Sequence, residues 1–291
     1  MNLTLSGDID ESLQDVLARM TSARSIVSLH ERALRFEAVT DTPEVRAAVA
    51  AECRSARVDH AFMHERATLL EYRVLAMDMD STLITIECID ELADLAGKKT
   101  EVAAITEAAM RGEIADFAES LKRRVALLAG TPAALLERVY AERLKLSPGA
   151  EDLLSAARHA GLATLLVSGG FTFFTARLQR RLGFDRARAN VLEIEGDRLT
   201  GRVVGGIIDA SGKACAVDDL LAECGASKAQ SIVIGDGAND LAMMAGAGLS
   251  IAFHAKPIVR AATSQAIDFG GLDVLLDWMA DAPNVPERES G

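Results

Sequence analysis

Short apolar runs alternate with amphipathic helical patterns along most of the chain after residue 70. A short apolar run bounded by polar residues is typical of a strand buried on both faces. Because strands that alternate with helices form parallel sheets, the pattern predicts an α/β core with a mostly parallel sheet. Four runs have this form: Val74–Met77, Ala163–Val167, Ser231–Ile234 and Leu249–Phe253.

The first 70 residues carry a different pattern, of shorter elements. Asp10 and Thr42 are typical N-cap residues, and Pro43 suits a first helical position. The expected order βαββαβ predicts a small α+β, ferredoxin-like module over residues 1–70. Its elements are Leu3–Leu5, Asp10–Met20, the hairpin of Ser25–Leu29 with Ala33–Val39, the helix from Thr42 to Arg57, and Val58–His64.

A long helical tract, residues 88–145, separates the first two apolar runs. Within it, Thr131 and Pro132 predict the start of a new helix. Farther on, Val191–Ile194 and Leu199–Val204 alternate around a glycine turn and predict a hairpin. Residues 282–291 contain two prolines and several charges, so we expect a flexible tail after a core of residues 71–281.

The chain has 291 residues, a hydrophobic fraction of 49% and a formal charge of -12. The apolar content predicts a sizeable core, and the acidic balance argues against nucleic acid and anionic membranes as partners. No basic patch leads into a long apolar stretch at the start, and no run of 18 apolar residues occurs. We therefore expect a soluble, cytoplasmic protein, whose four scattered cysteines stay reduced.

Polar residues follow three of the apolar runs. Asp78 and Asp80 come after the first, Ser168-Gly169-Gly170 after the second, and Gly235–Asp240 after the third. The carboxyl ends of parallel strands meet at one edge of a sheet, so these residues should gather there. Neighbouring carboxylates repel each other unless a cation or a shared proton relieves them.

This set of groups points to phosphoryl transfer. The carboxylates of Asp78, Asp80 and Asp236 suit a hard cation such as Mg²⁺. Backbone N–H groups of Ser168-Gly169-Gly170, which we expect to open a helix from Phe171, suit an anion. The P-loop motif GxxxxGK[ST] does not occur. We expect one aspartate to attack phosphorus and the other, two residues on, to move the proton of the leaving alcohol.

Two basic residues call for anionic partners. Arg124 lies on an apolar helix face, so its guanidinium needs a carboxylate or a phosphate. Lys213 lies at a helix start, where the helix dipole disfavours a cation, and a phosphate or the Asp78 carboxylate would compensate. A structural pairing of Arg124 with Glu113 or Asp116 is the alternative.

Together these residues resemble the haloacid dehalogenase superfamily, and within it the phosphatases that act on O-phosphoserine. In that family the second residue of the first motif is usually Phe; Met79 stands there, and we expect its side chain to point away from the site. The resemblance covers residues 74–273 and rests on an ordered set of motifs: Asp78-Met79-Asp80-Ser81-Thr82, Glu87 with Ile89-Asp90-Glu91, Ser120-Leu121-Lys122-Arg123-Arg124-Val125, Ser168-Gly169-Gly170-Phe171, Thr200-Gly201 leading to Ile208-Asp209-Ala210, Lys213, Gly235-Asp236-Gly237-Ala238-Asn239-Asp240, and Ala252-Phe253-His254-Ala255-Lys256-Pro257.

The resemblance implies a Rossmann-like core with a helical cap inserted at about residues 87–147. It implies hydrolysis of O-phosphoserine to serine, the last step of serine biosynthesis, through an aspartyl-phosphate. Asp78 would be the nucleophile and a Mg²⁺ ligand, and Asp80 the general acid/base with its backbone carbonyl on the metal. Asp236 would be the third metal ligand, supported by Asp240. Ser168, Gly169 and Lys213 would bind the phosphate, and Asn239 would contact the substrate region. Glu87 would bind the substrate ammonium and Arg124 the substrate carboxylate.

Residues 1–70 resemble the ACT-like, amino-acid-binding regulatory domains of some relatives, and we expect a homodimer through this module as one possible assembly. Two other functions stay open at this point. One is a phosphatase or phosphotransferase of the same superfamily that acts on another small phosphomonoester. The other is a non-catalytic protein that senses an amino acid through residues 1–70. His60 and His64 have metal-like spacing, but ordinary positions in a strand fit them better.

Overall fold

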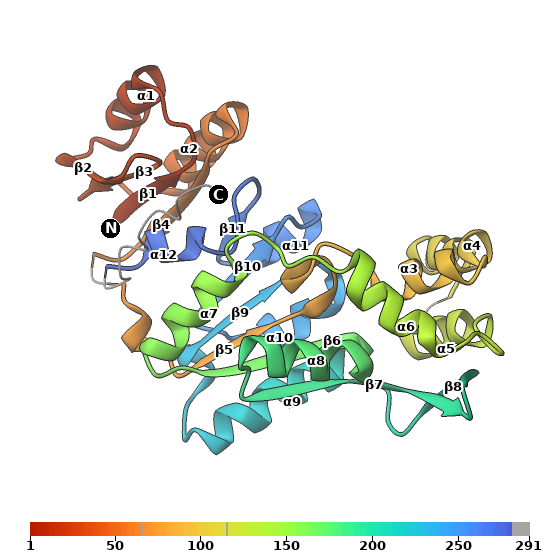
Figure 1. Ribbon diagram of the computed structural model, residues 1–291. Helices are drawn as coiled ribbons and strands as arrows, with labels where there is room; N and C mark the ends of the chain where they lie inside the picture. The colour runs from red at the N-terminus through yellow and green to blue at the C-terminus, as the bar shows by residue number, and fades with distance from the viewer. Residues whose placement is uncertain (66, 115, 281–291) are drawn as a thin grey trace.

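The computed structural model describes residues 1–65, 67–114 and 116–280, so the predicted tail, residues 282–291, lies outside the described residues. Figure 1 shows three parts: a small N-terminal module, a central sheet covered by helices, and a helical lobe on the far side. Eleven strands of the described chain form one sheet, in the order β2-β3-β1-β4-β11-β10-β9-β5-β6-β7-β8.

The central part of this sheet is parallel, as the apolar runs predict. Side chains alternate along β5, so Leu75 and Met77 join the hydrophobic cluster that includes α7 and α8, whereas Val74 and Ala76 face α9 and α10. Burial on both faces explains why the run is apolar at every position. The strands are β5 (Val74–Met77), β6 (Ala163–Phe171), β7 (Arg186–Glu195), β9 (Ser231–Gly235), β10 (Leu249–Phe253) and β11 (Gln265–Ile267), and the helices are α7 (Ala150–His159), α8 (Thr172–Leu182), α9 (Ala210–Glu223), α10 (Leu241–Met244) and α11 (Pro257–Ala262).

The predicted end of the second apolar strand and the predicted start of the helix after it are both wrong. The strand predicted to end at Val167 continues as β6 to Phe171, and α8 begins at Thr172. The backbone stays extended through the glycines, but its pairing with β7 is interrupted after Val167 and resumes at the pair Phe171–Asn190. Ser168-Gly169-Gly170 is therefore an irregular stretch inside a strand and does not open the helix.

The helical lobe is inserted between β5 and β6 and consists of α3 (Cys88–Leu95), α4 (Lys99–Met110), α5 (Phe117–Ala126), α6 (Ala134–Arg138) and the single turn η3 (Val139–Arg143). The hairpin of β7 and β8 (Arg198–Val204) reaches beneath it (Figure 1). Thr131 does not cap a helix, because its carbonyl accepts the Leu199 N–H at 2.9 Å and Pro132 pairs with Arg198. The helix begins only at Ala134.

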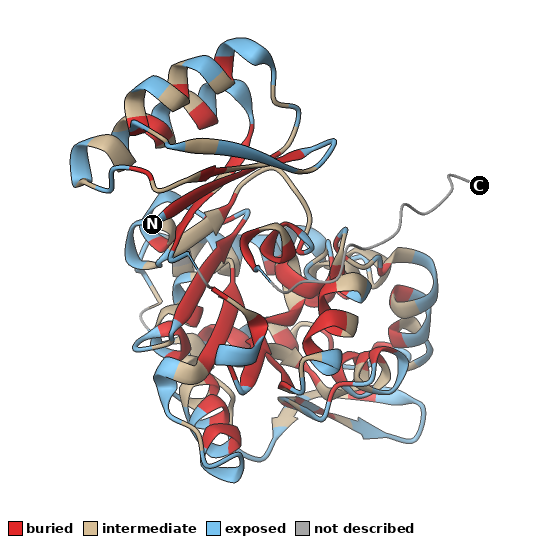
Figure 2. Ribbon diagram, turned by 90° about the vertical axis from the view of Figure 1, so that its left-hand side faces the viewer, coloured by how far each residue is buried: buried red, intermediate tan, exposed pale blue. Residues whose placement is uncertain are grey.

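The N-terminal module has the predicted order of elements: β1 (Asn2–Ser6), α1 (Glu11–Thr21), β2 (Ser25–His30), β3 (Ala33–Glu37), α2 (Pro43–Ala56) and β4 (Asp59–Met63). The Asp10 side chain accepts the Leu13 N–H and the Thr42 side chain accepts the Val45 N–H, so both predicted N-caps are present. Figure 2 shows the two helices of the module, with their buried residues toward its sheet and their exposed residues on the outer side.

The module and the core share their sheet, which the sequence patterns did not predict. His60 of β4 pairs antiparallel with Ala266 of β11. Beside this contact, the buried Asp59 carboxylate accepts backbone N–H groups of Asp268 and Gly270, each at 2.6 Å. After β11, α12 (Val274–Trp278) packs under the module, where Asp277 accepts the Ser6 hydroxyl at 2.6 Å.

Candidate active site

Asp78 lies directly beyond the carboxyl end of β5 and is buried. Its Oδ1 accepts the Met79 N–H at 2.7 Å and lies 2.8 Å from Lys213 Nζ. Lys213, in the first turn of α9, is 1% exposed and also lies 2.7 Å from Asp240 Oδ1. Burial by itself lowers the pKa of Lys213, but the two carboxylates outweigh it and raise that pKa. The Asp78 carboxylate is thus one of the two partners predicted for Lys213.

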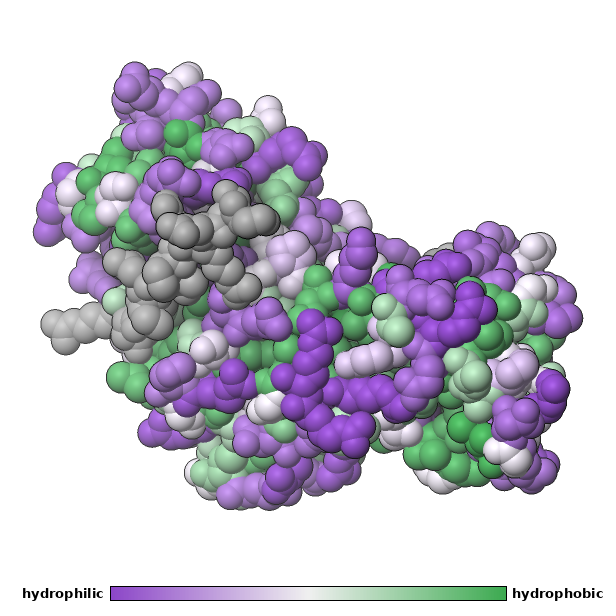
Figure 3. Space-filling view, viewed as in Figure 1, coloured by the Kyte–Doolittle hydropathy of each residue, from purple (hydrophilic) through white to green (hydrophobic). Residues whose placement is uncertain are grey.

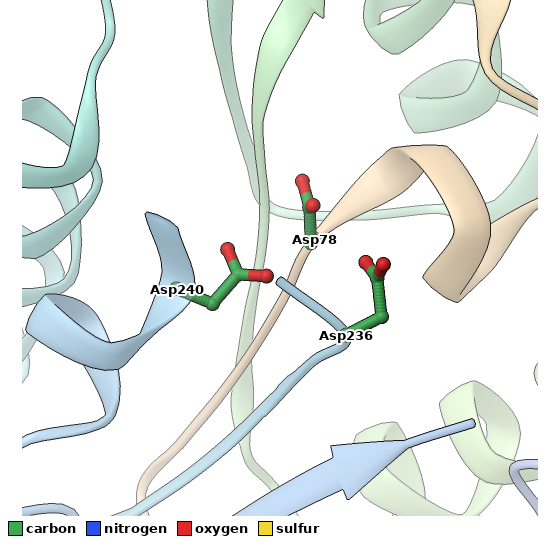
Figure 4. A group of neighbouring side chains, drawn as sticks. All are labelled: Asp78, Asp236 and Asp240. Atoms are coloured by element: carbon green, nitrogen blue, oxygen red, sulfur yellow. The ribbon is translucent and has the colours of Figure 1, made fainter. Parts of the chain in front are cut away.

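Three carboxylates converge at this edge of the sheet. One oxygen from each of Asp78, Asp236 and Asp240 lies within 4.8 Å of the other two; Figure 4 shows Asp78 on one segment, and Asp236 and Asp240 come from the single stretch that follows β9. Burial raises the pKa of Asp78, with Asp240 adding to the rise and Lys213 opposing it. Burial also raises the pKa of Asp236 to about 6. A buried group with more carboxylates than ammonium groups fits a hard cation with oxygen ligands.

Asp80 has partners of its own. Its Oδ1 accepts the Cys88 N–H at 2.8 Å, and its Oδ2 accepts the Ser168 hydroxyl at 3.2 Å. Burial raises the pKa of Asp80, while the hydrogen bonds from Cys88 and Ser168 and the charge of Lys213 oppose the rise. A carboxyl group with a raised pKa retains its proton more readily, which suits a general acid.

The three-carboxylate group differs from the predicted ligand set in one member. The Asp80 side chain is not part of it, and the Asp240 carboxylate is. The ligand predicted from Asp80 is its backbone carbonyl, and that assignment stays a prediction. Thr82 supports the group from the start of the lobe, because its hydroxyl donates to Asp236 Oδ1 at 3.1 Å.

The glycines after Val167 are required by close approach. A Cβ on Gly170 would lie 2.6 Å from Asp80 Oδ2, and a Cβ on Gly169 would lie 2.9 Å from the Phe117 ring of α5. The lobe therefore covers the stretch that is predicted to hold phosphate. Phe117 is not among the predicted site residues, because its contact with Gly169 depends on how α5 docks and leaves no signal in the sequence.

Glu87 precedes α3 and lies near Asp80. Ser81, whose φ of 56° is in the left-handed region, turns the chain after Asp80 and donates its hydroxyl to Glu87 Oε1 at 2.7 Å. Desolvation by the surrounding chain and then the charge of Asp80 raise the pKa of Glu87, although the residue itself remains exposed. Such a carboxylate gains from a cationic partner, as the predicted contact with a substrate ammonium requires.

Arg124 is half-buried on α5, and its Nε donates to the Ser120 carbonyl at 3.4 Å. Neither alternative partner binds it, because Glu113 pairs with Arg111 and Asp116 accepts the Ala118 N–H. Burial lowers the pKa of Arg124, and the nearby charges of Asp90, Glu87 and Asp80 oppose this. Arg124 therefore lies on the active-site side of the lobe.

Three other residues singled out in the sequence lie at or near this edge of the sheet or in the N-terminal module. Asn239 is half-buried in η5 (Ala238–Asp240), between Asp236 and Asp240 in the sequence. Met79 is buried in the hydrophobic core, but its Cε would lie 3.1 Å from a Cβ on Gly170, so the expectation that its side chain points away from the site stays a prediction. His64 lies one residue beyond β4, so its predicted strand position is wrong, and its Nε2 lies 3.0 Å from Glu71 Oε2.

The core and the lobe are also joined outside the site. Arg177 of α8 forms an ion pair with Glu137 of α6, and its guanidinium lies 3.5 Å from the centre of the Phe173 ring. Figure 3 shows hydrophilic side chains along this boundary between the core and the lobe. The Arg177–Glu137 pair therefore links α8 of the core to α6 of the lobe.

Residues 75–245 match the haloacid dehalogenase-like hydrolase family, and the chain belongs to that family. The helical lobe between β5 and β6 lies where the resemblance predicts the cap. Among the residues that the structure describes, no helix is long and apolar enough to cross a membrane.

Several relatives extend the comparison. The chain is 55% identical over 213 residues to a phosphoserine phosphatase from a Polaromonas species, which covers 72% of this chain and 90% of that protein. A haloacid dehalogenase family hydrolase from Salmonella enterica serovar Typhi has a TM-score of 0.85 at 32% identity, covering 96% of this chain and 98% of that one. A probable phosphoserine phosphatase from Vibrio cholerae, in unliganded form, has a TM-score of 0.82 at 33% identity, covering 97% of this chain and 86% of that one.

Proposed function

We propose that this chain hydrolyses O-phospho-L-serine to L-serine and phosphate, with Asp78 as the nucleophile and Asp80 as the general acid/base. The observation that carries the proposal is the different environment of two aspartates two residues apart. Asp78 is paired with Lys213 at 2.8 Å, whereas Asp80 accepts hydrogen bonds from Cys88 and Ser168. The relatives named as phosphoserine phosphatases support this choice of reaction.

The two aspartates divide the chemistry between them. Asp78 Oδ2 would attack phosphorus while Lys213 neutralises Oδ1, which gives an aspartyl-phosphate and releases the serine alkoxide. Asp80 donates its proton to that leaving oxygen, and its raised pKa favours the protonated form at the start. In the second step Asp80 takes a proton from water as the water attacks the acyl phosphate, which restores both carboxyl groups.

The residues present fit a divalent metal ion, and we propose Mg²⁺. Asp78, Asp236 and the backbone carbonyl of Asp80 are the predicted ligands, and the convergence of Asp240 on Asp78 and Asp236 makes it a supporting residue. When bound, such an ion neutralises negative charge on phosphate and lets the carboxylate approach it. Lys213, Ser168 and the Gly169 N–H would hold the phosphate oxygens from the protein side.

The substrate's amino-acid end is the part that chooses between phosphoserine and other phosphomonoesters. Glu87 carries a carboxylate near Asp80, and Arg124 carries a guanidinium on the active-site side of the lobe. One negative and one positive group suit the ammonium and carboxylate of a zwitterion. A phosphatase for simple phosphomonoesters does not need a carboxylate and a guanidinium to recognise its substrate. Other small phosphomonoesters are therefore less well supported as the substrate than phosphoserine.

Phosphate release measured across a small substrate panel, with and without Mg²⁺, tests the proposal. We expect Mg²⁺-dependent release from phosphoserine, and a KM for phosphoserine that rises at least 10-fold in Arg124→Met and in Glu87→Gln. Hydrolysis of an aryl phosphate, which lacks both charged groups, should change less than threefold in the same variants. Equal effects on both substrates would contradict the assigned recognition roles. No release from any phosphomonoester would leave the non-catalytic, amino-acid-sensing alternative.

A further inference from the structure

Asn190 is a buried polar residue at the point where the pairing of β6 with β7 is irregular. It lies on β7, opposite Phe171, at the point where pairing between β6 and β7 resumes after the interruption. Its side chain is 0% exposed. A buried amide must find hydrogen-bond partners for both its oxygen and its nitrogen, or the fold loses about 1–3 kcal/mol for each unpaired group.

Both ends of the Asn190 amide are used, and each reaches a segment that carries a predicted phosphate ligand. Its Nδ2 donates to the carbonyl of Gly169 at 2.8 Å, and its Oδ1 accepts the N–H of Ile208 at 2.8 Å. Gly169 belongs to the irregular stretch after Val167, and Ile208 lies just before α9, whose first turn carries Lys213. The donor and acceptor types of the two partners fix the orientation of the amide.

The interruption of the ladder explains why a side chain is needed here. In a regular parallel pair, the Gly169 carbonyl would accept a backbone N–H from β7, but that partner is lost where the backbone bulges. The Asn190 amide supplies the missing donor. Since a peptide unit is planar, fixing the Gly169 carbonyl also fixes the direction of the Gly170 N–H, which donates to the Ser168 hydroxyl at 2.8 Å and so helps to orient that predicted phosphate ligand.

We propose that Asn190 is a positioning residue for the phosphate site, because it ties the Gly169 peptide to the segment that leads into the Lys213 helix. It touches neither substrate nor the reacting atoms. Its contribution is preorganisation: it holds two separate phosphate-binding segments in one relative geometry before the anion arrives. This inference rests on the proposed function, because that function assigns Ser168, Gly169 and Lys213 to phosphate.

The test uses Asn190→Asp and Asn190→Ala in the full-length protein. The aspartate keeps the volume of the side chain and its acceptor for Ile208, but it places an oxygen against the Gly169 carbonyl. The alanine removes both hydrogen bonds. Two quantities are measured: the Kd for inorganic phosphate in the presence of Mg²⁺ by calorimetry, and the KM and kcat for phosphoserine.

Thr164→Val is the matched control. Thr164 is also 0% exposed and lies on β6, but at the opposite end from Ser168. Its hydroxyl donates to Asp185 Oδ2 at 2.9 Å and accepts the Asp185 N–H at 3.0 Å. This variant therefore also breaks two part-buried hydrogen bonds of a buried side chain and lowers Tm, without touching a phosphate-binding segment.

We expect both Asn190 variants to raise the Kd for phosphate and the KM for phosphoserine on the order of 10- to 100-fold, since small displacements at a site have effects of this size. The Thr164→Val control should leave both constants within about twofold. Folded Asn190 variants that bind phosphate as tightly as the wild type would overturn the inference, as would an equal loss in the control. If the alanine variant does not fold, the isosteric aspartate variant decides.

The wild-type result separates this inference from the proposed function. A wild-type protein that binds inorganic phosphate but does not hydrolyse phosphoserine contradicts the proposed substrate only. The phosphate affinities of the Asn190 variants still decide the positioning role in that case.

Discussion

Replacing Lys213 by methionine tests the charge balance of the site. The Lys213 ammonium is 1% exposed and lies 2.8 Å from Asp78 and 2.7 Å from Asp240. At an effective dielectric constant of about 20, unit charges at this separation attract each other by about 6 kcal/mol before desolvation is counted. Measured losses on breaking buried pairs are about 3–5 kcal/mol, and we expect a loss of this size in the free energy of unfolding of the metal-free protein.

Thermal unfolding in EDTA and in saturating Mg²⁺ measures the effect. The expected loss corresponds to a decrease in Tm of roughly 10 °C in EDTA. Mg²⁺ should restore part of it, because a cation beside Asp78 and Asp240 relieves the same repulsion. The kcat for phosphoserine should fall on the order of 10²- to 10³-fold in Mg²⁺, since the variant loses a preorganised positive charge beside the phosphate.

Lys228→Met is the matched control for this experiment. Lys228 pairs with Asp218 at 3.1 Å, but the two side chains are 46% and 49% exposed. An exposed pair of this kind contributes less than about 1 kcal/mol. A Lys213→Met variant whose Tm in EDTA stays within about 2 °C of the wild type would refute the reasoning, because the carboxylates would then not depend on the ammonium.

Three further predictions concern pH, the junction between the module and the core, and assembly. Burial raises the pKa of Asp236 to about 6, so the metal-free folded protein loses stability as the pH rises from the ordinary carboxyl pKa of about 4 through that value. Stabilisation by Mg²⁺ should therefore be larger at about pH 7.5 than at about pH 5.5, and equal Tm increases at both would contradict this. Asp59→Ala leaves the buried N–H groups beyond β11 without their acceptor and should cost about 2–4 kcal/mol by thermal unfolding. The KM for phosphoserine should stay unchanged in this variant, whereas a large rise in KM would mean that the junction shapes the site. In the predicted homodimer, β2 is the free edge of the module, with Ile26 and Val27 exposed by 42% and 40%. Sedimentation should show a dimer that Val27→Lys dissociates, and a wild-type monomer would contradict the prediction.

Local patterns predicted the core well because its strands obey simple rules. The run Val74–Met77 is apolar at every position because helices cover both faces of the sheet, and this is visible without a structure. The carboxyl ends of β5 and β9 had to meet at one edge, so Asp78 and Asp236 were predicted as neighbours from topology alone. The N-caps Asp10 and Thr42 follow equally local chemistry.

Features that depend on tertiary contacts were not predictable. β11 has only three residues, and it forms between β10 and β4, which lie far from each other in the sequence. The Thr131 boundary failed because the hairpin of β7 and β8 takes the hydrogen bonds that a helix start would have used. Asn190 carried no motif, because its importance comes from a bulge in the neighbouring strand. The amino-acid-binding role expected for residues 1–70 stays a prediction.

Reductive trapping tests most directly the central claim that Asp78 attacks phosphorus. Borohydride reduces an acyl phosphate to an alcohol, so it converts a phosphorylated aspartate to homoserine. After quenching during turnover of phosphoserine, peptide mass spectrometry should find homoserine at position 78, and should find aspartate there when substrate is omitted. A protein that releases phosphate while position 78 stays aspartate under these conditions, with the modification at another residue, would contradict the account.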